Sequence, residues 1–246
     1  DNLKIVKPQF GRQFAVGLFK NWKDNKWETS IEAYHKKMDN LIEYKEGALP
    51  EDNTNTASDE SFTFGDGESY GLEFFIKRRL GKTTGWLGYT ISKTTRYFEE
   101  LNNGIGFPAK YDRTHDLSLT ATHELNENWV LSAVFVYATG NTLTPALDRY
   151  IIDGDIYTEF ADRNSYRMPA YHRMDLSATY TRNKANKRFN SSWNFSIYNV
   201  YNRANPYFIY FDVEGDGNLT DGGLEPKAFQ ISIFPIIPSV AWNFNF

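Results

Sequence analysis

Short connections and long polar stretches alternate along this chain from one end to the other. The short connections are residues 23–26, 81–84, 124–128 and 183–188. The long polar stretches are residues 46–60, 98–110, 140–168 and 212–227. Antiparallel strands joined in this way place every short turn at one end of a sheet and every long loop at the other. The alternation therefore predicts a sheet with two unlike ends.

The segments between these connections alternate apolar and polar residues with the period of two that is typical of strands. Leu117 and Leu119, for example, fall on one face, and Ser118 falls on the other. The pattern predicts about nine strands, near residues 9–22, 27–45, 62–80, 84–97, 111–124, 129–139, 169–182, 189–211 and 228–246. In the last of them the alternation changes phase beside Pro235 and Pro238, which predicts a bulge or an unpaired stretch there.

The composition suits a sheet that meets lipid on one face and water on the other. Aromatic residues make up 17% of the chain, yet its mean hydropathy is −0.57. No stretch approaches the roughly 18 apolar residues that a transmembrane helix requires. We therefore expect an all-β fold, a transmembrane antiparallel up-and-down β-barrel with short periplasmic turns and long extracellular loops.

Charge and cysteine content exclude other classes of protein. The net charge of −4 gives no electrostatic reason to expect a nucleic acid partner. The chain has no cysteine, which excludes a disulfide scaffold and a thiolate metal site. The first eight residues have neither the basic nor the apolar region of a signal peptide.

The tryptophans lie close to the short connections or to the end of the last predicted strand. Tryptophan prefers the membrane interface, where its ring is buried in an apolar layer and its N–H remains hydrated. We expect five of them to mark the turn side of the membrane: Trp22, Trp27, Trp129, Trp193 and Trp242. Trp86 is the exception, because its parity matches the polar face that holds Thr90 and Ser92.

An odd number of strands has a further implication for the architecture. Bacterial barrels normally have an even number of strands, and nine strands cannot leave two open edges in hydrocarbon. We therefore expect the chain to be the C-terminal part of a larger barrel.

Several stretches resemble the TonB-dependent outer-membrane receptors. They are Lys-Tyr-Asp-Arg-Thr-His-Asp-Leu-Ser-Leu at 110–119, Tyr-Ala-Thr-Gly-Asn at 137–141, Tyr-Arg-Met-Pro-Ala-Tyr-His-Arg-Met-Asp-Leu-Ser at 166–177, Tyr-Asn-Val-Tyr-Asn-Arg-Ala-Asn-Pro-Tyr at 198–207, and the ending with Phe-Pro-Ile-Ile-Pro-Ser at 234–239 and Asn-Phe at 245–246. Receptors of this kind have a barrel of about 22 strands plugged by an N-terminal domain. The resemblance implies that this chain supplies about the last nine strands of such a barrel, in the cell outer membrane.

The resemblance also implies a function and a set of partners. The function is the energised uptake of a scarce solute such as an iron chelate, a cofactor, a glycan or a peptide. The implied partners are outer-membrane lipid, the N-terminal barrel half and plug, TonB acting through the plug, and the barrel-assembly machinery, which reads the terminal Phe246; a surface lipoprotein is a further partner. Two alternatives remain open from the residues, a passive porin or adhesin barrel and a soluble β-sandwich binding module.

No set of residues has the spacing of a catalytic site, so we expect the chain not to be an enzyme. None of the four histidines has a metal-ligand spacing such as His-Glu-x-x-His. The cluster at 113–116 places His115 beside Asp116, but residues at the start of a strand more often pair with the neighbouring strands.

One acidic loop has the spacing of the first half of a calcium-binding loop. Its candidate ligands are Asp212, Glu214, Asp216 and Asn218. A bidentate glutamate is expected at the twelfth position, where Gly223 stands, so a solvated acidic turn is the favoured interpretation and no cofactor is required.

Two further sets of residues are candidates for binding. Charges on the polar face belong in a water-filled or plug-filled lumen, and we expect this of Glu28, Glu32, Glu73, Asp116, Arg173 and Asp175. Pairing within the barrel wall is the alternative role for each of them. Aromatic residues on long loops are candidates for ligand contact, namely Tyr150, Tyr157, Phe160 and Tyr166.

Overall fold

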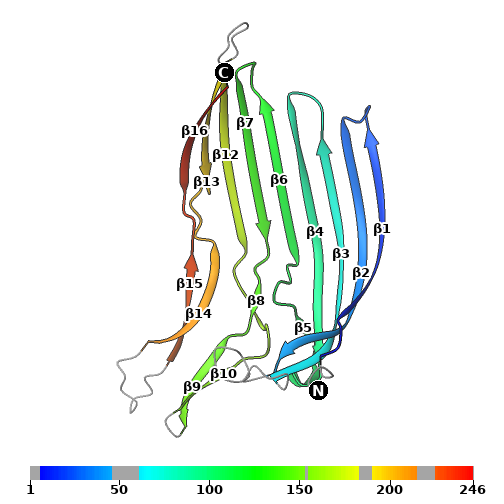
Figure 1. Cartoon of the computed structure of the whole chain (residues 1–246), viewed down its shortest axis with the longest axis vertical. Coiled ribbons are helices and arrows are strands. Elements are labelled where there is room, and N and C mark those ends of the chain that lie inside the picture. Colours follow the sequence, from blue (N-terminus) through cyan, green and yellow to red (C-terminus); the bar gives the residue numbers. More distant parts are fainter. Residues whose placement is uncertain (1–5, 46–60, 153–154, 183–189, 215–224, 246) are drawn as a thin grey trace.

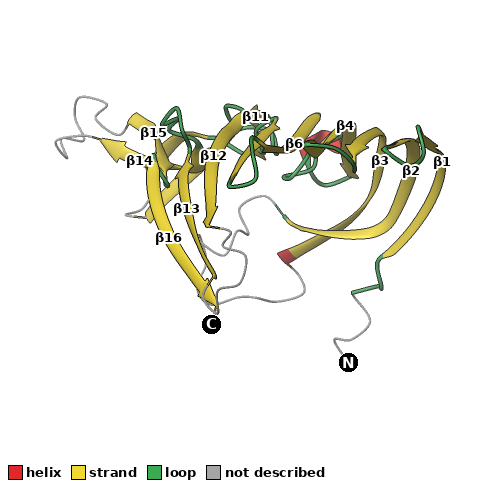
Figure 2. Ribbon diagram, turned by 90° about the horizontal axis from the view of Figure 1, so that it is seen from above, coloured by secondary structure: helices red, strands yellow, loops and turns green. Residues whose placement is uncertain are grey.

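Nine long antiparallel strands form one continuous curved sheet (Figures 1 and 2). The computed structural model describes residues 6–45, 61–152, 155–182, 190–214 and 225–245. In order across the sheet, the strands are β1 (Phe10–Trp22), β2 (Trp27–Tyr44), β3 (Phe62–Arg78), β4 (Thr83–Phe98), β6 (His115–Glu124), β7 (Trp129–Ala138), β12 (Tyr171–Arg182), β13 (Asn190–Tyr198) and β16 (Ile237–Asn245). The predicted antiparallel all-β fold is confirmed, and the sheet remains open between β1 and β16.

The remaining elements lie at the end of the sheet opposite the tight turns (Figure 1). β5 (Phe107–Pro108) adds to β4, and three small two-stranded sheets stand apart from the main one. They pair β8 (Thr142–Leu143) with β11 (Tyr166–Arg167), β9 (Ala146–Ile152) with β10 (Asp155–Phe160), and β14 (Pro206–Glu214) with β15 (Glu225–Ser232). A 3-10 turn covers Asn102–Gly104.

Among the described residues, no helix has both the length and the apolar character needed to cross a membrane.

The tight turn between β1 and β2 depends on residues that tolerate left-handed backbone. Lys23, Asp24 and Asn25 have φ values of 48°, 54° and 62°, and asparagine and aspartate are the residues other than glycine that adopt this region most readily. The amide of Lys26 closes the turn on the carbonyl of Lys23 at 3.1 Å. This geometry places Trp22 directly opposite Trp27.

Two predicted strands are each divided in the structure. The segment predicted at 189–211 forms β13 and then β14, and the segment predicted at 228–246 forms β15 and then β16. An unpaired stretch near the two prolines is confirmed at 233–236, but it is a break rather than a one-residue bulge, and Phe234 has a φ of 62° there. The physical reason is that β14 and β15 pair with each other in a separate hairpin.

Cross-strand register gives the main sheet two unlike faces. Leu18, Ile31 and Phe74 are successive partners across β1, β2 and β3, and all three are exposed apolar side chains. On the opposite face, Glu32 is the partner of Glu73 in the neighbouring strand. Because directly paired residues point to the same side of a sheet, the sheet has one apolar face and one polar face.

A small buried core lies at the loop end of the sheet. Phe98 and Leu101 are 1% and 0% exposed, and they form a cluster with Leu41 and Phe107. Phe98 and Phe107 stack with their ring centres 5.9 Å apart. The stretch predicted as a polar, irregular loop at 98–110 therefore contains much of this core, since Leu101 and Phe107 fold back over β4.

We predict that Phe98→Ala loosens the loop end, because deleting a buried aromatic ring costs about 3–5 kcal/mol. Limited proteolysis should cleave residues 99–114 faster in the variant than in the unchanged protein. Tyr97→Ala is the matched control, since Tyr97 is 44% exposed on the other face of the same strand. Equal cleavage of the two variants would contradict the assignment of a core to this segment.

Candidate functional site

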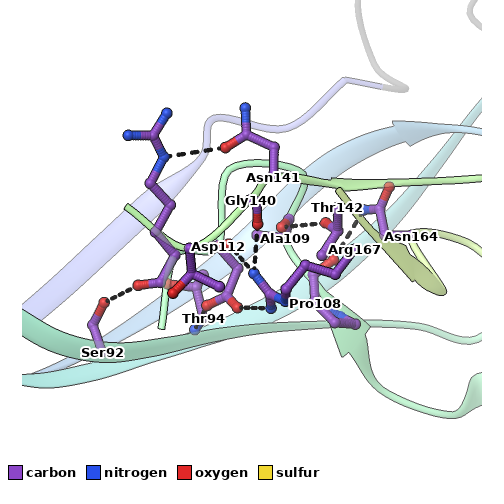
Figure 3. A network of polar contacts seen from close by, with 12 residues as sticks. Ser92, Thr94, Pro108, Ala109, Asp112, Gly140, Asn141, Thr142, Asn164 and Arg167 are labelled. Atoms are coloured by element: carbon purple, nitrogen blue, oxygen red, sulfur yellow. Dashed lines mark hydrogen bonds and ion pairs between the residues drawn. The ribbon is translucent and has the colours of Figure 1, made fainter. Parts of the chain in front are cut away.

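An ion pair with a buried carboxylate joins two long connections at the loop end (Figure 3). The carboxylate of Asp112 is 3% exposed and lies 2.6 Å from Nη2 of Arg167. Nη1 of Arg167 donates to the backbone carbonyls of Asp112 and Gly140 at 2.6 and 2.8 Å. The other carboxylate oxygen of Asp112 accepts from the amide of Thr94 at 2.7 Å. One carboxylate therefore fixes β4, the approach to β6 and the β11 segment together.

Two further buried polar residues extend this connection (Figure 3). The hydroxyl of Thr142 donates to the carbonyl of Ala109 at 2.9 Å. The side-chain amide of Asn164 donates to the carbonyl of Pro108 at 2.9 Å. Both side chains are buried, and buried polar groups that find partners hold a segment in one position. The loops at 98–110 and 140–168 are thus joined into one scaffold.

A second buried network lies between β13 and β16. The side chain of Asn199 is fully buried and donates to the carbonyls of Arg203 and Phe234 at 2.9 and 3.1 Å. Its backbone amide donates to a carboxylate oxygen of Asp175 at 2.9 Å. Asn199 has a φ of 53°, so the chain reverses at a residue that tolerates left-handed backbone. This network ends β13 and positions the segment before β16.

Asn205 and Arg203 attach the same segment to the start of β12. The side-chain oxygen of Asn205 accepts from the amide of His172 at 3.0 Å, and its side-chain nitrogen donates to the carbonyl of His172 at 2.9 Å. Arg203 donates to the carbonyl of Ala170 at 3.0 Å. The hydroxyl of Tyr201 lies 2.9 Å from Nδ1 of His172. Partial burial raises the pKa of the Tyr201 phenol above its ordinary value.

The predicted loop aromatics are spread over two small sheets. Tyr150 and Tyr157 are opposite each other in the β9–β10 hairpin, and Phe160 follows in β10 opposite Ala146. Tyr166 lies in β11 and is 47% exposed. Their role in ligand contact stays a prediction.

All six predicted lumen charges lie on the polar face of the sheet. Cross-strand pairing shows this, because the residues paired with one another from β2 to β12 point to the same side of the sheet. Glu32, Glu73, Thr90 and Asp116 form one row across four strands. Glu32 and Glu73 carry like charges in directly opposed positions, an arrangement that is unfavourable in an antiparallel pair.

Four of the six charges have partners within the same sheet or its nearby connections. Arg79 Nε donates to Glu28 at 2.9 Å. Arg173 lies 3.0 Å from Asp175, and Arg113 lies 3.7 Å from Asp116. Pairing within the wall thus accounts for Glu28, Asp116, Arg173 and Asp175. Within the described ranges, Glu32 and Glu73 make no ion pair.

Four aromatic residues form a continuous row on the apolar face near the turn end. Trp129 is opposite Tyr180, Tyr180 is opposite Trp193, and Trp193 is opposite Trp242. The ring centres are 5.1 Å apart for Trp129 and Tyr180 and 5.7 Å apart for the last two tryptophans. We call these four residues the tryptophan row.

The other tryptophans lie on the faces that the alternation of residues predicts. Trp22 and Trp27 lie on the apolar face beside the first turn, and Lys20 lies over the ring of Trp22 at 3.9 Å. Trp86 lies on the polar face, where it stacks on Phe75 at 6.2 Å. Phe246, the predicted assembly signal, lies outside the described residues.

A second aromatic row bounds the apolar face toward the loop end. Tyr137 is opposite His172, and their rings stack at 6.4 Å. Tyr137 stands eight positions from Trp129 in β7. At about 3.4 Å per residue and a tilt of about 40°, this spacing corresponds to a band about 20 Å tall, close to the ~25 Å apolar band of transmembrane barrels.

The sequence of this chain matches a family model described as "TonB dependent receptor-like, beta-barrel" over residues 2–202. The chain belongs to this family. No curated protein matches it in sequence.

The fold of this receptor barrel chain is similar to several solved receptors. The ferripyoverdine receptor of the outer membrane of Pseudomonas aeruginosa is 15% identical with a TM-score of 0.59, covering 97% of this chain and 27% of that one. The ferric-catecholate import receptor Fiu from E. coli K12 is 13% identical with a TM-score of 0.55, covering 98% and 28%. The ferric citrate transporter FecA is 12% identical with a TM-score of 0.55, covering 96% and 31%. The chain thus spans less than a third of each of these receptors.

The predicted calcium loop of the receptor chain lies largely outside the described residues. Asp212 is in β14 opposite Lys227, and the backbone of Glu214 pairs with Glu225. Asp216 and Asn218 are outside the described residues. Among the residues that are described, no group of three acidic or histidine side chains could hold a metal ion, and calcium binding by the loop stays a prediction.

Sequence reasoning missed the two buried networks of the receptor's loop end. Asp112, Arg167 and Asn199 were noticed only as parts of the stretches that resemble the family. The available signal is local: Asn199, Asn202 and Asn205 are closely spaced within the segment predicted as a strand at 189–211, a spacing that is typical of turns. Their partners are distant in sequence, which no local pattern indicates.

We predict that Arg167→Gln loosens the connection between β7 and β12, because it leaves the buried carboxylate of Asp112 without its cation. Hydrogen bonds to charged groups contribute about 1.5–3 kcal/mol. Hydrogen exchange should become faster across residues 139–170. Arg12→Gln is the control, since Arg12 is 71% exposed and pairs with Asp39 across β1 and β2, on strands that do not adjoin this connection. The same exchange across residues 139–170 in both variants would contradict the proposed anchoring.

Proposed function

We propose that this chain forms wall strands and loop-end structure of an outer-membrane TonB-dependent receptor that takes up a scarce solute. The observation that carries the proposal is the two-faced sheet, with an apolar face bounded by aromatic rows and a polar face bearing charges. Membership of the receptor family supports the same conclusion. The receptors of this family are transporters and not enzymes.

The apolar face supports a position across the membrane. Apolar side chains on nine adjoining strands have no second layer of protein over them among the described residues, which argues against a soluble β-sandwich. Aromatic girdles at both interfaces and an apolar band between them are what a transmembrane barrel presents to lipid. The tryptophan row then marks the periplasmic side, and the long connections lie outside the cell.

The two edge strands support additional strands as partners. In the described part of the chain, β1 pairs only with β2 and β16 pairs only with β13. Backbone groups at such edges cannot remain unpaired in hydrocarbon. Further barrel strands pair with these edges, and an N-terminal plug fills the space in front of the polar face, where Glu32 and Glu73 are available to it.

The transport mechanism follows from this arrangement and from the family. The extracellular loops capture the solute, with Tyr150, Tyr157, Phe160 and Tyr166 as candidate contacts on a scaffold fixed by Asp112 and Asn199. TonB acts on the plug and not on this chain. The barrel-assembly machinery reads Phe246, and a surface lipoprotein is a further partner. We favour an iron chelate as solute because three structures of similar fold are receptors or transporters of iron chelates by their names.

Uptake measurements test this function. Cells lacking the receptor should lose uptake of at least one of three radioactive ferric complexes, with a catecholate, a hydroxamate or citrate, and deletion of TonB should remove the same uptake. Uptake that depends on the receptor but persists without TonB would establish a passive pore instead. If the receptor's deletion affects none of the three complexes, the iron-chelate class is wrong.

We predict that the same substitution by arginine has unequal effects at two adjacent residues of β6. Leu119→Arg should impair assembly of the barrel, because arginine on the lipid face near the midplane costs about 2–4 kcal/mol. Ser118→Arg should be much milder, since register places Ser118 on the polar face with Gly88 and Val136. The measurement is the amount of folded receptor in outer membranes, and equal effects would reverse the assignment of the faces.

A further inference from the structure

An open groove interrupts the apolar face beside the tryptophan row. It has a volume of about 570 Å³ and is lined mainly by apolar side chains of β6, β7, β12, β13 and β16. Its size falls within the ~300–1,000 Å³ of typical ligand sites. Leu131, Leu176 and Phe195 form its sides.

Three alanines account for the groove. Ala121 is opposite Ala133, and Ala178 is flanked by Leu131 and Phe195 in the neighbouring strands. On the side away from the turns, the same face carries Leu119, Phe135 and Met174 as successive partners, two residues along from Ala121 and Ala133. On the other side it carries the tryptophan row. Small side chains between two rows of large ones leave a depression in the surface.

A second hollow continues the groove toward the turn end. It measures about 350 Å³ and is lined by Trp129, Tyr180, Trp193 and Phe195. Phe195 borders both hollows. The combined depression therefore runs from the middle of the apolar face to the aromatic residues at its boundary.

We propose that this groove holds one acyl chain of a phospholipid from the turn-side leaflet in a fixed position. The inference rests on the proposed membrane location of the apolar face. Within a bilayer, hydrocarbon is the material in contact with such a surface, and the groove is continuous with that surface. Its apolar lining offers hydrocarbon good contact and offers water little. The acyl chain enters the groove from the tryptophan row, where the lipid headgroup stays hydrated, and lies along Ala133 and Ala178.

Photo-crosslinking of the unchanged receptor tests the proposal without any substitution. The whole receptor is reconstituted in vesicles of phosphatidylethanolamine and phosphatidylglycerol, with a fraction of the phosphatidylethanolamine carrying a diazirine on its acyl chain. We expect severalfold more label on Leu131, Leu176 and Phe195 than on Ile31 and Leu72, which are exposed on the same face outside the groove. Even labelling of all five would overturn the fixed site while leaving the membrane location intact.

A matched pair of variants gives the second measurement. Ala133→Phe fills the groove, whereas Ala33→Phe makes the same change on the same face of β2, between Val16 and Leu72. Native mass spectrometry should find one retained phospholipid on the unchanged receptor and on Ala33→Phe, and loss of it on Ala133→Phe. Retention by both variants would overturn the site, as would crosslinks from the groove to a second copy of the receptor. An absence of any lipid label on the apolar face would instead contradict the proposed membrane location.

Discussion

Cross-strand register is the constraint on which the rest of this structure depends. Side chains alternate with a period of two, so the pairing of each strand decides which residues meet on a face. Leu18, Ile31 and Phe74 align on the apolar face because β1, β2 and β3 keep one register. A slip of one residue would bring Glu73 to that face. The tryptophan row and the alanine-lined groove depend on the same alignment across β7, β12, β13 and β16.

The loop end depends on buried polar residues as well as on strand pairing. Long connections are costly to order, and each needs contacts that offset its lost conformational freedom. Asp112 and Asn199 provide these contacts by bonding several backbone groups at once. The result is a fixed base at the loop end, where the β9–β10 hairpin carries three of the four candidate ligand aromatics. A rigid base is what a loop that captures a solute requires.

Sequence reasoning succeeded where the signal is periodic and failed where it is not. The alternation around Leu119 predicted its face, and parity separated Trp86 from the other tryptophans, because the period of two is a local property. The core residues Leu101 and Phe107 lie in a stretch that the sequence predicts to be a polar loop, since two apolar residues without a period do not indicate burial. The division of the last two predicted strands was missed because β14 and β15 alternate as well as barrel strands do.

The residue pattern alone predicts a two-faced sheet of about nine strands, with tight turns at one end, long connections at the other and the tryptophans near the turns. These features follow from residue spacing within single segments. Three-dimensional closure pairs Asp112 with Arg167, 55 residues away, brings the Asn199 side chain to the carbonyl of Phe234, and gives Glu28, Asp116, Arg173 and Asp175 oppositely charged neighbours. Such partners are chosen by how the connections close in space, and no local period along the chain records that choice.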